Sequence, residues 1–294
     1  MRNSMRDTFK EKWEHNRRLA FEETLREGSD IFSWILRRNG FGSADELTEY
    51  LKDKKRVLDA GCGNGRVTAL LRRYSPHTTE IIGIDLVSLE IARENLEAYH
   101  LSHNVYFLLR DLLGDLTDLG KFDFIYCQEV LHHTSDPELA FKNLCKLLSF
   151  GGEIAIYVYK KKAPVREYVD DYVRGKISGL TYEEAIQVCK QITELGRSLS
   201  QHGITIQVPR VDALEIEGGE YDLQRFIYHF FMKCFWNPHL SFQENVAINY
   251  DWYHPQIATR HTLEEVREWF IRAKLRIVHE HLDFYGITVR GRLV

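Results

Sequence analysis

The residues best placed to do chemistry begin with a glycine-spaced segment, Asp59-Ala60-Gly61-Cys62-Gly63-Asn64-Gly65. It follows a short apolar run and precedes a stretch with helical spacing from about Val67. Glycine has no Cβ and tolerates positive φ, so such a turn can bring backbone N–H groups against a ligand. The start of a helix also suits an anionic group, because its first N–H groups are unpaired. The alternative is a strand-to-helix turn that binds nothing.

The spacing of this turn separates two classes of nucleotide-binding site. A dinucleotide fingerprint, G-x-G-x-x-G, would require glycine at the position of Arg66. The observed pattern is D-x-G-x-G-x-G, so nicotinamide binding is disfavoured. Asp85 ends the next apolar run, roughly 20 residues beyond the turn, where a carboxylate can accept hydrogen bonds from both hydroxyls of a ribose. Capping of a helix over 87–99 is the competing role for Asp85.

The D-x-G-x-G-x-G segment resembles motif I of the class I S-adenosylmethionine-dependent methyltransferases. The resemblance implies S-adenosylmethionine as cofactor and S-adenosylhomocysteine as product. It implies that Asp85 holds the ribose diol, and that Asp111 and the backbone after it reach the adenine. The residues that it assigns to cofactor binding follow four successive strands: Asp59, Gly61, Cys62, Gly63, Gly65, Asp85, Leu86, Asp111, Leu112, Gln128 and Glu129.

The segment 128–137 resembles motif IV of small-molecule methyltransferases and lacks the N-P-P-Y form of amino-adenine and glutamine methyltransferases. It contains His132 and His133, and a third histidine, His254, lies farther along the chain. A neutral imidazole can accept the acceptor's proton near pH 7, so these three are the candidate catalytic bases. Each has a purely structural role as its alternative. Adjacent histidines are expected to point apart, and Gln128 stands where a carboxylate would be expected, so no metal is predicted.

Runs with strand character alternate with helical segments over 52–160 and 256–294. This order predicts an α/β fold, a doubly wound, Rossmann-like and mostly parallel sheet that binds ligands at the carboxyl ends of its strands. Two runs near the C-terminus resemble the reversed last strand of this superfamily. Residues 1–51 are expected to form an N-terminal helical cap, with one helix over about 5–27 and others over 30–38 and 44–51.

The remaining segment, 161–255, is expected to be a mainly helical insertion that forms an acceptor-binding lid. Helices are expected near 165–174, 182–199 and 224–235, with a possible strand over 204–208. The aromatic residues of 226–236 are interpreted as lid core, with a pocket wall or a dimer face as alternatives. The candidate acceptor-binding residues are Tyr250, Asp251, Tyr253, Arg260 and His261. A hinge with Asp251 paired to Arg260 is the alternative.

The amino-acid composition limits the classes of partner that the protein can bind. With 44% hydrophobic residues and a net charge of −4 among 294 residues, the chain can bury a core but has no basic field for nucleic acid. No apolar run approaches a membrane span, and the five scattered cysteines are typical of a reducing compartment, so a cytoplasmic protein is expected. We expect methyl transfer to O or N of a small polar metabolite, a sugar or natural-product-like molecule. The alternatives are a protein or tRNA methyltransferase and a catalytically silent S-adenosylmethionine-binding protein; a homodimer is possible.

Overall fold

The computed structural model describes residues 5–87 and 89–294, which divide into two compact units. The sheet unit holds Trp13–Lys160 and Thr259–Val294. The inserted unit holds Lys161–Ala258 together with the described residues up to Lys12. The helices of residues 13–51 therefore belong with the sheet. Among the described residues, no helix combines the length and apolarity that a bilayer crossing demands.

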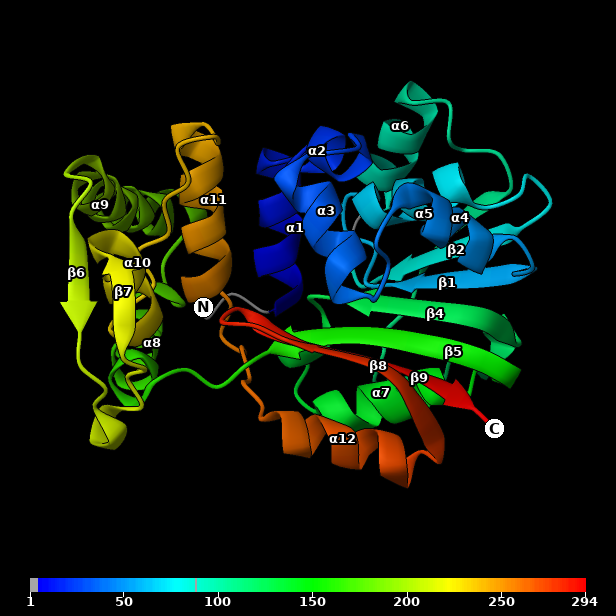
Figure 1. Ribbon diagram of the computed structural model, residues 1–294. Helices are drawn as coiled ribbons and strands as arrows, with labels where there is room; N and C mark the ends of the chain where they lie inside the picture. The colour runs from blue at the N-terminus through cyan, green and yellow to red at the C-terminus, as the bar shows by residue number, and fades with distance from the viewer. Residues whose placement is uncertain (1–4, 88) are drawn as a thin grey trace. The chain divides into compact units, whose positions relative to one another are not determined.

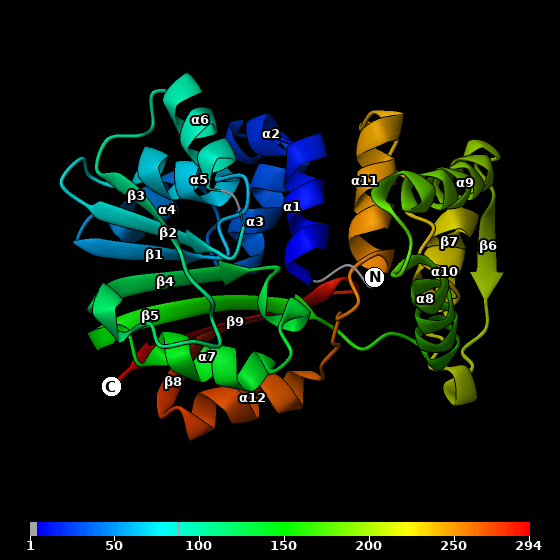
Figure 2. The same cartoon turned by 180° about the vertical axis from the view of Figure 1, so that it is seen from behind.

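The sheet unit is built on seven strands in the order β3-β2-β1-β4-β5-β9-β8 (Figures 1 and 2). The first five pair in parallel, and β9 runs antiparallel to both β5 and β8. The strands are β1 Arg56–Ala60, β2 Glu80–Asp85, β3 Val105–Leu109, β4 Phe122–Gln128, β5 Leu148–Tyr159, β8 Leu275–Leu282 and β9 Gly286–Leu293. This confirms the predicted doubly wound, mostly parallel sheet with a reversed last strand.

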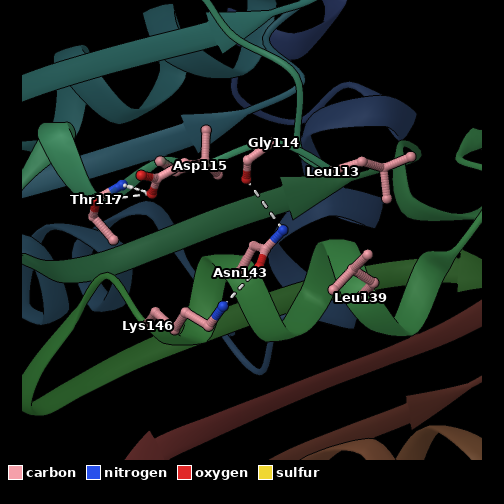
Figure 3. Close-up of a pocket in the computed structure, with 8 residues that line it drawn as sticks. Leu113, Gly114, Asp115, Thr117, Leu139, Asn143 and Lys146 are labelled. Atoms are coloured by element: carbon pink, nitrogen blue, oxygen red, sulfur yellow. Dashed lines mark hydrogen bonds between the residues drawn. The ribbon is translucent and has the colours of Figure 1, made fainter.

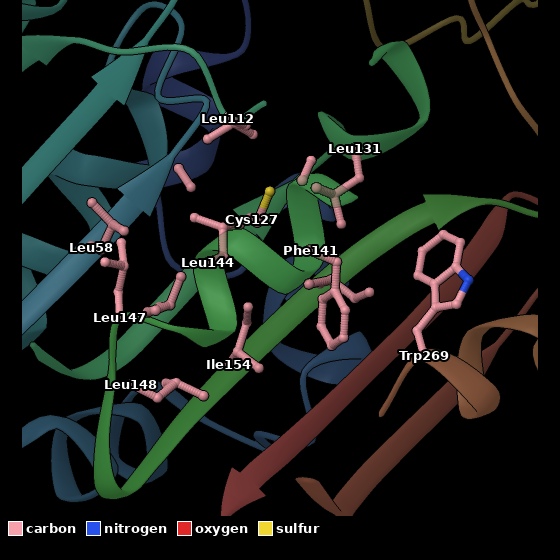
Figure 4. Packing of buried hydrophobic residues seen from close by; sticks show 14 of the residues in the cluster. Leu58, Leu112, Cys127, Leu131, Phe141, Leu144, Leu147, Leu148, Ile154 and Trp269 are labelled. Carbon is pink, nitrogen blue, oxygen red and sulfur yellow. The ribbon is translucent and has the colours of Figure 1, made fainter. Parts of the chain in front are cut away.

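Side chains of the central strands alternate between two apolar layers, as a strand with both faces covered requires. On one face, Ile125 and Cys127 join the core beneath α7 (Pro137–Cys145) and α12 (Leu263–Arg272). Figure 4 shows Phe141 of α7 and Trp269 of α12 in this layer. On the other face, Phe124 and Tyr126 pack with helices before and between the first strands. Those helices are α2 Phe21–Leu25, α3 Asp30–Arg38, α4 Ala44–Leu51, α5 Arg66–Tyr74 and α6 Glu90–Ala98.

The single helix expected over 5–27 is wrong. The structure has α1 (Met5–His15) and α2, separated by residues 16–20. Ala20 adopts a left-handed φ of 54°, which ends helical continuity. Short 3₁₀ turns, η1 (Thr117–Leu119) and η3 (Asp212–Leu214), lie elsewhere in the chain.

The inserted unit is mainly helical, with α8 (Pro164–Ile177), α9 (Tyr182–Gln201), α10 (Leu223–Phe230) and α11 (Phe242–Tyr253). Its hairpin pairs β6 (Thr205–Val208) with β7 (Gly219–Asp222). The sequence predicted the first three helices approximately but missed α11 and the hairpin partner β7.

One buried carboxylate connects the elements of the inserted unit. Asp170 of α8 accepts hydrogen bonds from Arg166 Nε at 3.1 Å, Trp252 Nε1 at 2.9 Å and Tyr253 Oη at 2.7 Å. It also accepts from the Lys233 backbone N–H at 2.9 Å. A buried charge is tolerated when it is paired and fully hydrogen-bonded, so this network fixes α8 against α11.

Candidate functional site

The glycine turn after β1 needs glycine for both conformation and space. Gly61 and Gly63 have φ of 83° and 53°, in the left-handed region that side chains disfavour. A Cβ on Gly61 would lie 2.2 Å from Val130 Cγ2, and one on Gly63 would lie 2.5 Å from the Trp13 ring. The turn therefore brings bare backbone against its neighbours, and α5 begins directly after Gly65, as the sequence predicted.

Two asparagines fix this turn, although the sequence analysis assigned them no role. Asn64 is buried, and its Nδ2 donates to the Leu19 carbonyl at 3.1 Å. Asn95 Nδ2 donates to the carbonyls of Arg17 at 2.8 Å and Asn64 at 3.0 Å. The residues between α1 and α2 therefore fix the turn. Because they are not helical, their carbonyl groups are available to accept these hydrogen bonds.

Asp59 lies beneath the turn. It is 2% exposed, and its Oδ2 accepts a hydrogen bond from Thr68 Oγ1 at 2.5 Å. The pKa of Asp59 is raised to about 7, mainly by desolvation; the Thr68 hydrogen bond lowers this pKa, and the charge of Asp85 raises it. This carboxyl group ties β1 to α5, so its predicted part in cofactor binding would be through the turn that it supports.

Asp85 ends β2 beside the same turn. Its Oδ2 accepts from the Gly63 N–H at 2.8 Å and its Oδ1 from the Val87 N–H at 3.2 Å. A carboxylate can accept several hydrogen bonds at once, so these two backbone bonds are compatible with contact to a ligand diol. The competing role as a helix cap is wrong, because α6 begins at Glu90 with Leu89 as its N-cap. Leu86, the next residue, is 40% exposed, which leaves an apolar surface beside the carboxylate.

The loop after β3 is shaped by its own hydrogen bonds. Asp111 Oδ1 accepts from the Leu113 N–H at 2.9 Å, and the Leu112 side chain is buried in the sheet core. Asn143 Nδ2 of α7 donates to the Leu112 carbonyl at 3.0 Å and to the Gly114 carbonyl at 3.2 Å, the second of which Figure 3 shows. The exposed carboxylate of Asp111 and the backbone of Leu112 are therefore the parts of this loop that remain for an adenine.

A pocket of about 270 Å³ lies beside this loop, between it and α7 (Figure 3). Its walls contain none of the residues predicted to bind cofactor or acceptor. The lining residues are Leu113, Gly114, Asp115, Leu116, Thr117, Leu139, Asn143 and Lys146.

The segment after β4 turns back toward the glycine turn. Glu129 has a left-handed φ of 59°, a conformation that costs a side-chain-bearing residue about 1–2 kcal/mol. Its Oε2 accepts from Arg66 Nη2 at 2.9 Å, which offsets part of that cost. The next residue, Val130, is the one whose side chain contacts Gly61. The predicted motif I and motif IV segments thus meet through these two contacts.

The paired histidines lie on η2 (Leu131–His133), directly after this segment. The His132 ring stacks on Tyr159 with centroids 3.6 Å apart. The backbone carbonyl of His132 accepts a hydrogen bond from the Thr259 N–H at 2.8 Å. His132 is fully buried, whereas His133 is 8% exposed. Of the two imidazoles, His133 therefore has the greater access to a ligand at the end of β4.

The third candidate base, His254, lies within the inserted unit. Its Nε2 is 3.1 Å from the Leu180 carbonyl oxygen, so the neutral ring donates from that nitrogen. Desolvation lowers the pKa of His254, which keeps the ring neutral. The ring is fully buried and stacks on Tyr250 at 4.5 Å, as a structural histidine would.

The predicted acceptor-binding residues are divided between the two units. Tyr250 and Tyr253 are fully buried on α11, and Tyr253 bonds Asp170, so this segment is helical core rather than an open rim. Asp251 pairs with Lys12 Nζ at 2.5 Å. The alternative in which Asp251 pairs with Arg260 stays a prediction.

Arg260 and His261 belong to the sheet unit. The His261 N–H donates to the Tyr159 carbonyl at 2.9 Å, and its ring meets Trp269 edge-on at 4.8 Å. These contacts place them beside the end of β5, near His132. Among the residues that the structure describes, no group of three or more His, Cys, Asp or Glu side chains is placed to hold a metal ion.

A family model described as a methyltransferase domain matches residues 51–200, a little over half of the chain. The chain is 35% identical over 145 residues to an uncharacterized protein of Synechococcus sp., a match that covers 47% of this chain and 34% of that protein. It is 25% identical over 193 residues to the ubiquinone biosynthesis O-methyltransferase of Coxiella burnetii, covering 62% and 76% of the two chains. The solved structure of PKMT2 from Rickettsia typhi has a similar fold, with a TM-score of 0.54 at 16% identity, covering 84% of this chain and 52% of that one.

Proposed function

Because this chain belongs to the methyltransferase domain family, as a class I S-adenosylmethionine-dependent methyltransferase, we propose that it methylates an oxygen of a small polar acceptor. S-Adenosylmethionine supplies the methyl group already activated as a sulfonium. The choice of oxygen is supported by the Coxiella burnetii relative, whose name is that of an O-methyltransferase. The small acceptor is supported by the net charge of −4, which gives no broad basic surface for nucleic acid.

The observation that carries the proposal is the glycine turn beside Asp85. Gly61 and Gly63 present backbone where a Cβ would collide with neighbours, and the Asp85 carboxylate lies beside this turn and next to the exposed Leu86. These features fit an adenosyl group: Asp85 would hold the ribose hydroxyls, and Leu86 would cover an apolar ring face. The Asp111 carboxylate, two residues after β3, would accept from the adenine amino group.

The chain's own contribution to the reaction is alignment and proton removal. The Arg66–Glu129 ion pair holds the segment after β4 against the glycine turn, so the acceptor that this segment binds faces the donor. The His133 imidazole would take the proton from the attacking hydroxyl, since it lies on η2 and is the more exposed of the two histidines. Arg260 and His261, beside the end of β5, would contact polar groups of the acceptor.

The cofactor assignment is tested by calorimetric titration with S-adenosylhomocysteine. We expect Asp85→Ala to weaken binding about tenfold or more, since charge-assisted hydrogen bonds contribute about 1.5–3 kcal/mol each. Asp123→Ala is the matched control. Asp123 Oδ2 also accepts two backbone N–H groups, from Lys55 at 2.7 Å and Arg56 at 3.0 Å, but at the opposite end of the strands. Equal affinities for all three proteins, or no heat with the parent, would contradict the assignment.

The acceptor class is tested with methyl-labelled S-adenosylmethionine and a cell extract divided by size. We expect label to appear in a molecule of the small-molecule fraction. Label in protein or RNA would overturn the proposed acceptor class. The absence of any labelled product, with donor binding intact, would overturn turnover itself.

A further inference from the structure

Arg38, the last residue of α3, is a buried cation whose guanidinium N–H groups lack hydrogen-bond acceptors among the described residues. It is 1% exposed, and its Cζ lies 3.6 Å from the Trp34 ring centroid and 4.0 Å from the Tyr157 ring centroid. Among the described residues, Nε, Nη1 and Nη2 of this guanidinium have no hydrogen-bond partner. The two rings satisfy the faces of the guanidinium by cation–π contact but offer nothing to its five N–H groups, which point along its plane.

A second buried donor without an acceptor among the described residues is the side-chain amide of Gln128, and a chain of hydrogen bonds fixes its orientation. Asn39 Nδ2 donates to the Ile35 carbonyl at 2.8 Å and to Tyr126 Oη at 2.8 Å. The Ile35 carbonyl can only accept, which fixes the Asn39 amide, and Tyr126 must then donate its own proton to Gln128 Oε1. The Nε2 of Gln128 is therefore the group that points elsewhere, and it is buried with no partner among the described residues.

Sheet register brings these groups together. Gln128 on β4 is level with Tyr157 on β5, and Tyr157 is level with Thr288 on β9. Partners in register place their side chains on the same face, so Gln128 and Thr288 flank the ring on which Arg38 stacks. The Thr288 Oγ1 is also buried and has no partner among the described residues. We call Arg38, Gln128 and Thr288 the Arg38 cluster.

Glu153, a carboxylate on the neighbouring part of this face, has other partners. Glu153 accepts from Tyr50 Oη at 2.8 Å and Arg292 Nε at 2.8 Å, and lies 3.3 Å from Arg290 Nε. A second cation therefore lies beside the cluster, and no anion in the described part of the chain neutralises Arg38. Burying an unpaired cation is costly, so a ligand that supplies anionic oxygen here would form the hydrogen bonds that Arg38 lacks.

We propose that the Arg38 cluster binds a carboxylate carried by the acceptor. This inference rests on the proposed function, because the cluster lies at the carboxyl ends of β4 and β5, next to the segment that would hold the acceptor. The planar guanidinium fork matches a carboxylate, and Gln128 Nε2 and the Thr288 hydroxyl add donors beside it. Since Arg38 is almost fully covered, binding requires α3 or the segment after β4 to move aside. The acceptor is then an acid with a hydroxyl group elsewhere in the molecule.

The test uses the whole protein saturated with S-adenosylhomocysteine and two probes of equal shape, benzoate and benzamide. Only benzoate offers an anionic pair of oxygens. We expect benzoate to bind the parent at least tenfold more tightly than benzamide in calorimetry or ligand-observed NMR. Arg38→Gln should lose that preference while its affinity for S-adenosylhomocysteine stays within twofold. Arg37→Gln, an exposed arginine on the same helix, is the matched control and should keep it.

A second variant guards against misfolding of the first. Gln128→Glu keeps an oxygen for the Tyr126 hydrogen bond but replaces the Nε2 donor with a second anionic oxygen. We expect it to weaken benzoate binding at least tenfold, with a melting temperature close to that of the parent. Benzoate should raise the melting temperature of the parent but of neither variant.

The outcomes separate the two sources of a carboxylate. If Arg38→Gln weakens S-adenosylhomocysteine tenfold and leaves benzoate unchanged, the cluster holds the cofactor's own carboxylate and the proposal is overturned. Equal binding of benzoate and benzamide, or no binding of either, also overturns it. Neither result touches the proposed methyl transfer, which is judged by S-adenosylhomocysteine heat and labelled product in the parent alone.

Discussion

Replacing Asp59 with asparagine should remove a loss of stability that the parent suffers as pH rises, so the stability of the variant relative to the parent should grow with pH. Burial raises the pKa of Asp59 from 3.8 to about 7 in the folded state. An acid whose pKa is raised on folding binds more protons when folded, so stability falls as pH rises from the unfolded pKa to the folded one. The cost of ionising Asp59 is therefore absent well below pH 4 and complete above pH 7.

The magnitude follows from the size of the shift. At 1.36 kcal/mol per pKa unit, the full cost is about 4 kcal/mol, of which about 2.5 kcal/mol develops between pH 5 and pH 8. An asparagine side chain cannot ionise, so the parent should lose about 2.5 kcal/mol relative to Asp59→Asn over that interval. The new amide also needs a partner beside Thr68, but this cost does not depend on pH. The pH slope of the difference, rather than its absolute value, is thus the quantity to measure.

The assay is urea unfolding of both proteins at half-unit intervals from pH 5 to pH 8. Groups common to the two proteins cancel in the difference. Thr68→Val supplies a second arm: the Thr68 hydrogen bond lowers the pKa of Asp59, so its removal should extend the fall in stability to higher pH. Stability differences that stay constant across this range would refute the reasoning, because they would mean that Asp59 ionises as easily in the folded state as in the unfolded one.

Two further changes test the inserted unit and the proposed base. Asp170→Ala should lower the free energy of unfolding by about 3–5 kcal/mol in urea titrations followed by tryptophan fluorescence, because it leaves Arg166 charged and buried without its partner. His133→Ala should lower kcat about 100-fold and flatten the acidic limb of the pH–kcat profile, measured as release of S-adenosylhomocysteine, with KM nearly unchanged. His132→Ala should alter kcat without removing that limb; the reverse pattern would assign the base to His132.

The parts of the fold that could be predicted are those that local spacing encodes. The glycine turn and the apolar run that ends at Asp85 are each encoded in a few consecutive residues, and both lie where the sequence predicts them. The parallel order of the strands followed from their alternation with helices. The seven-stranded sheet and its reversed last strand confirm that inference.

Other features were present in the sequence but were not used. Ser241 and Glu244 form a capping box at the start of α11, and this pattern could have identified the helix that carries Tyr250 and Tyr253. The segment was instead interpreted as a polar rim, because its mixture of tyrosine, aspartate and histidine suggested ligand contact. Burial reverses that interpretation, since those side chains face the core of their own unit.

The remaining features depend on contacts between distant residues and have no local signal. Asn64 and Asn95 hold the glycine turn only because residues 16–20 leave their helix and present carbonyl groups. Arg38 stands in an ordinary helical end, beside another arginine, and nothing in its neighbours marks it as buried. Arg38 is buried because it stacks on Tyr157, which lies more than a hundred residues away in the sequence. The order of the strands in the sheet brings Tyr157 to this position.

The carboxyl edge of the sheet carries carboxyl groups at one side and hydrogen-bond donors at the other. This distribution matches the charges of the proposed reactants. Near the ends of β1 and β2 this edge carries two carboxyl groups, Asp59 and Asp85, close enough for the charge of Asp85 to raise the pKa of Asp59. Across β4, β5 and β9 it carries the donors of the Arg38 cluster. A sulfonium cation suits the first side and an acceptor carboxylate the second. Because attack on the sulfonium removes its positive charge, the product nucleoside interacts less strongly with the acidic side, which favours its exchange for fresh cofactor while the acidic product leaves separately.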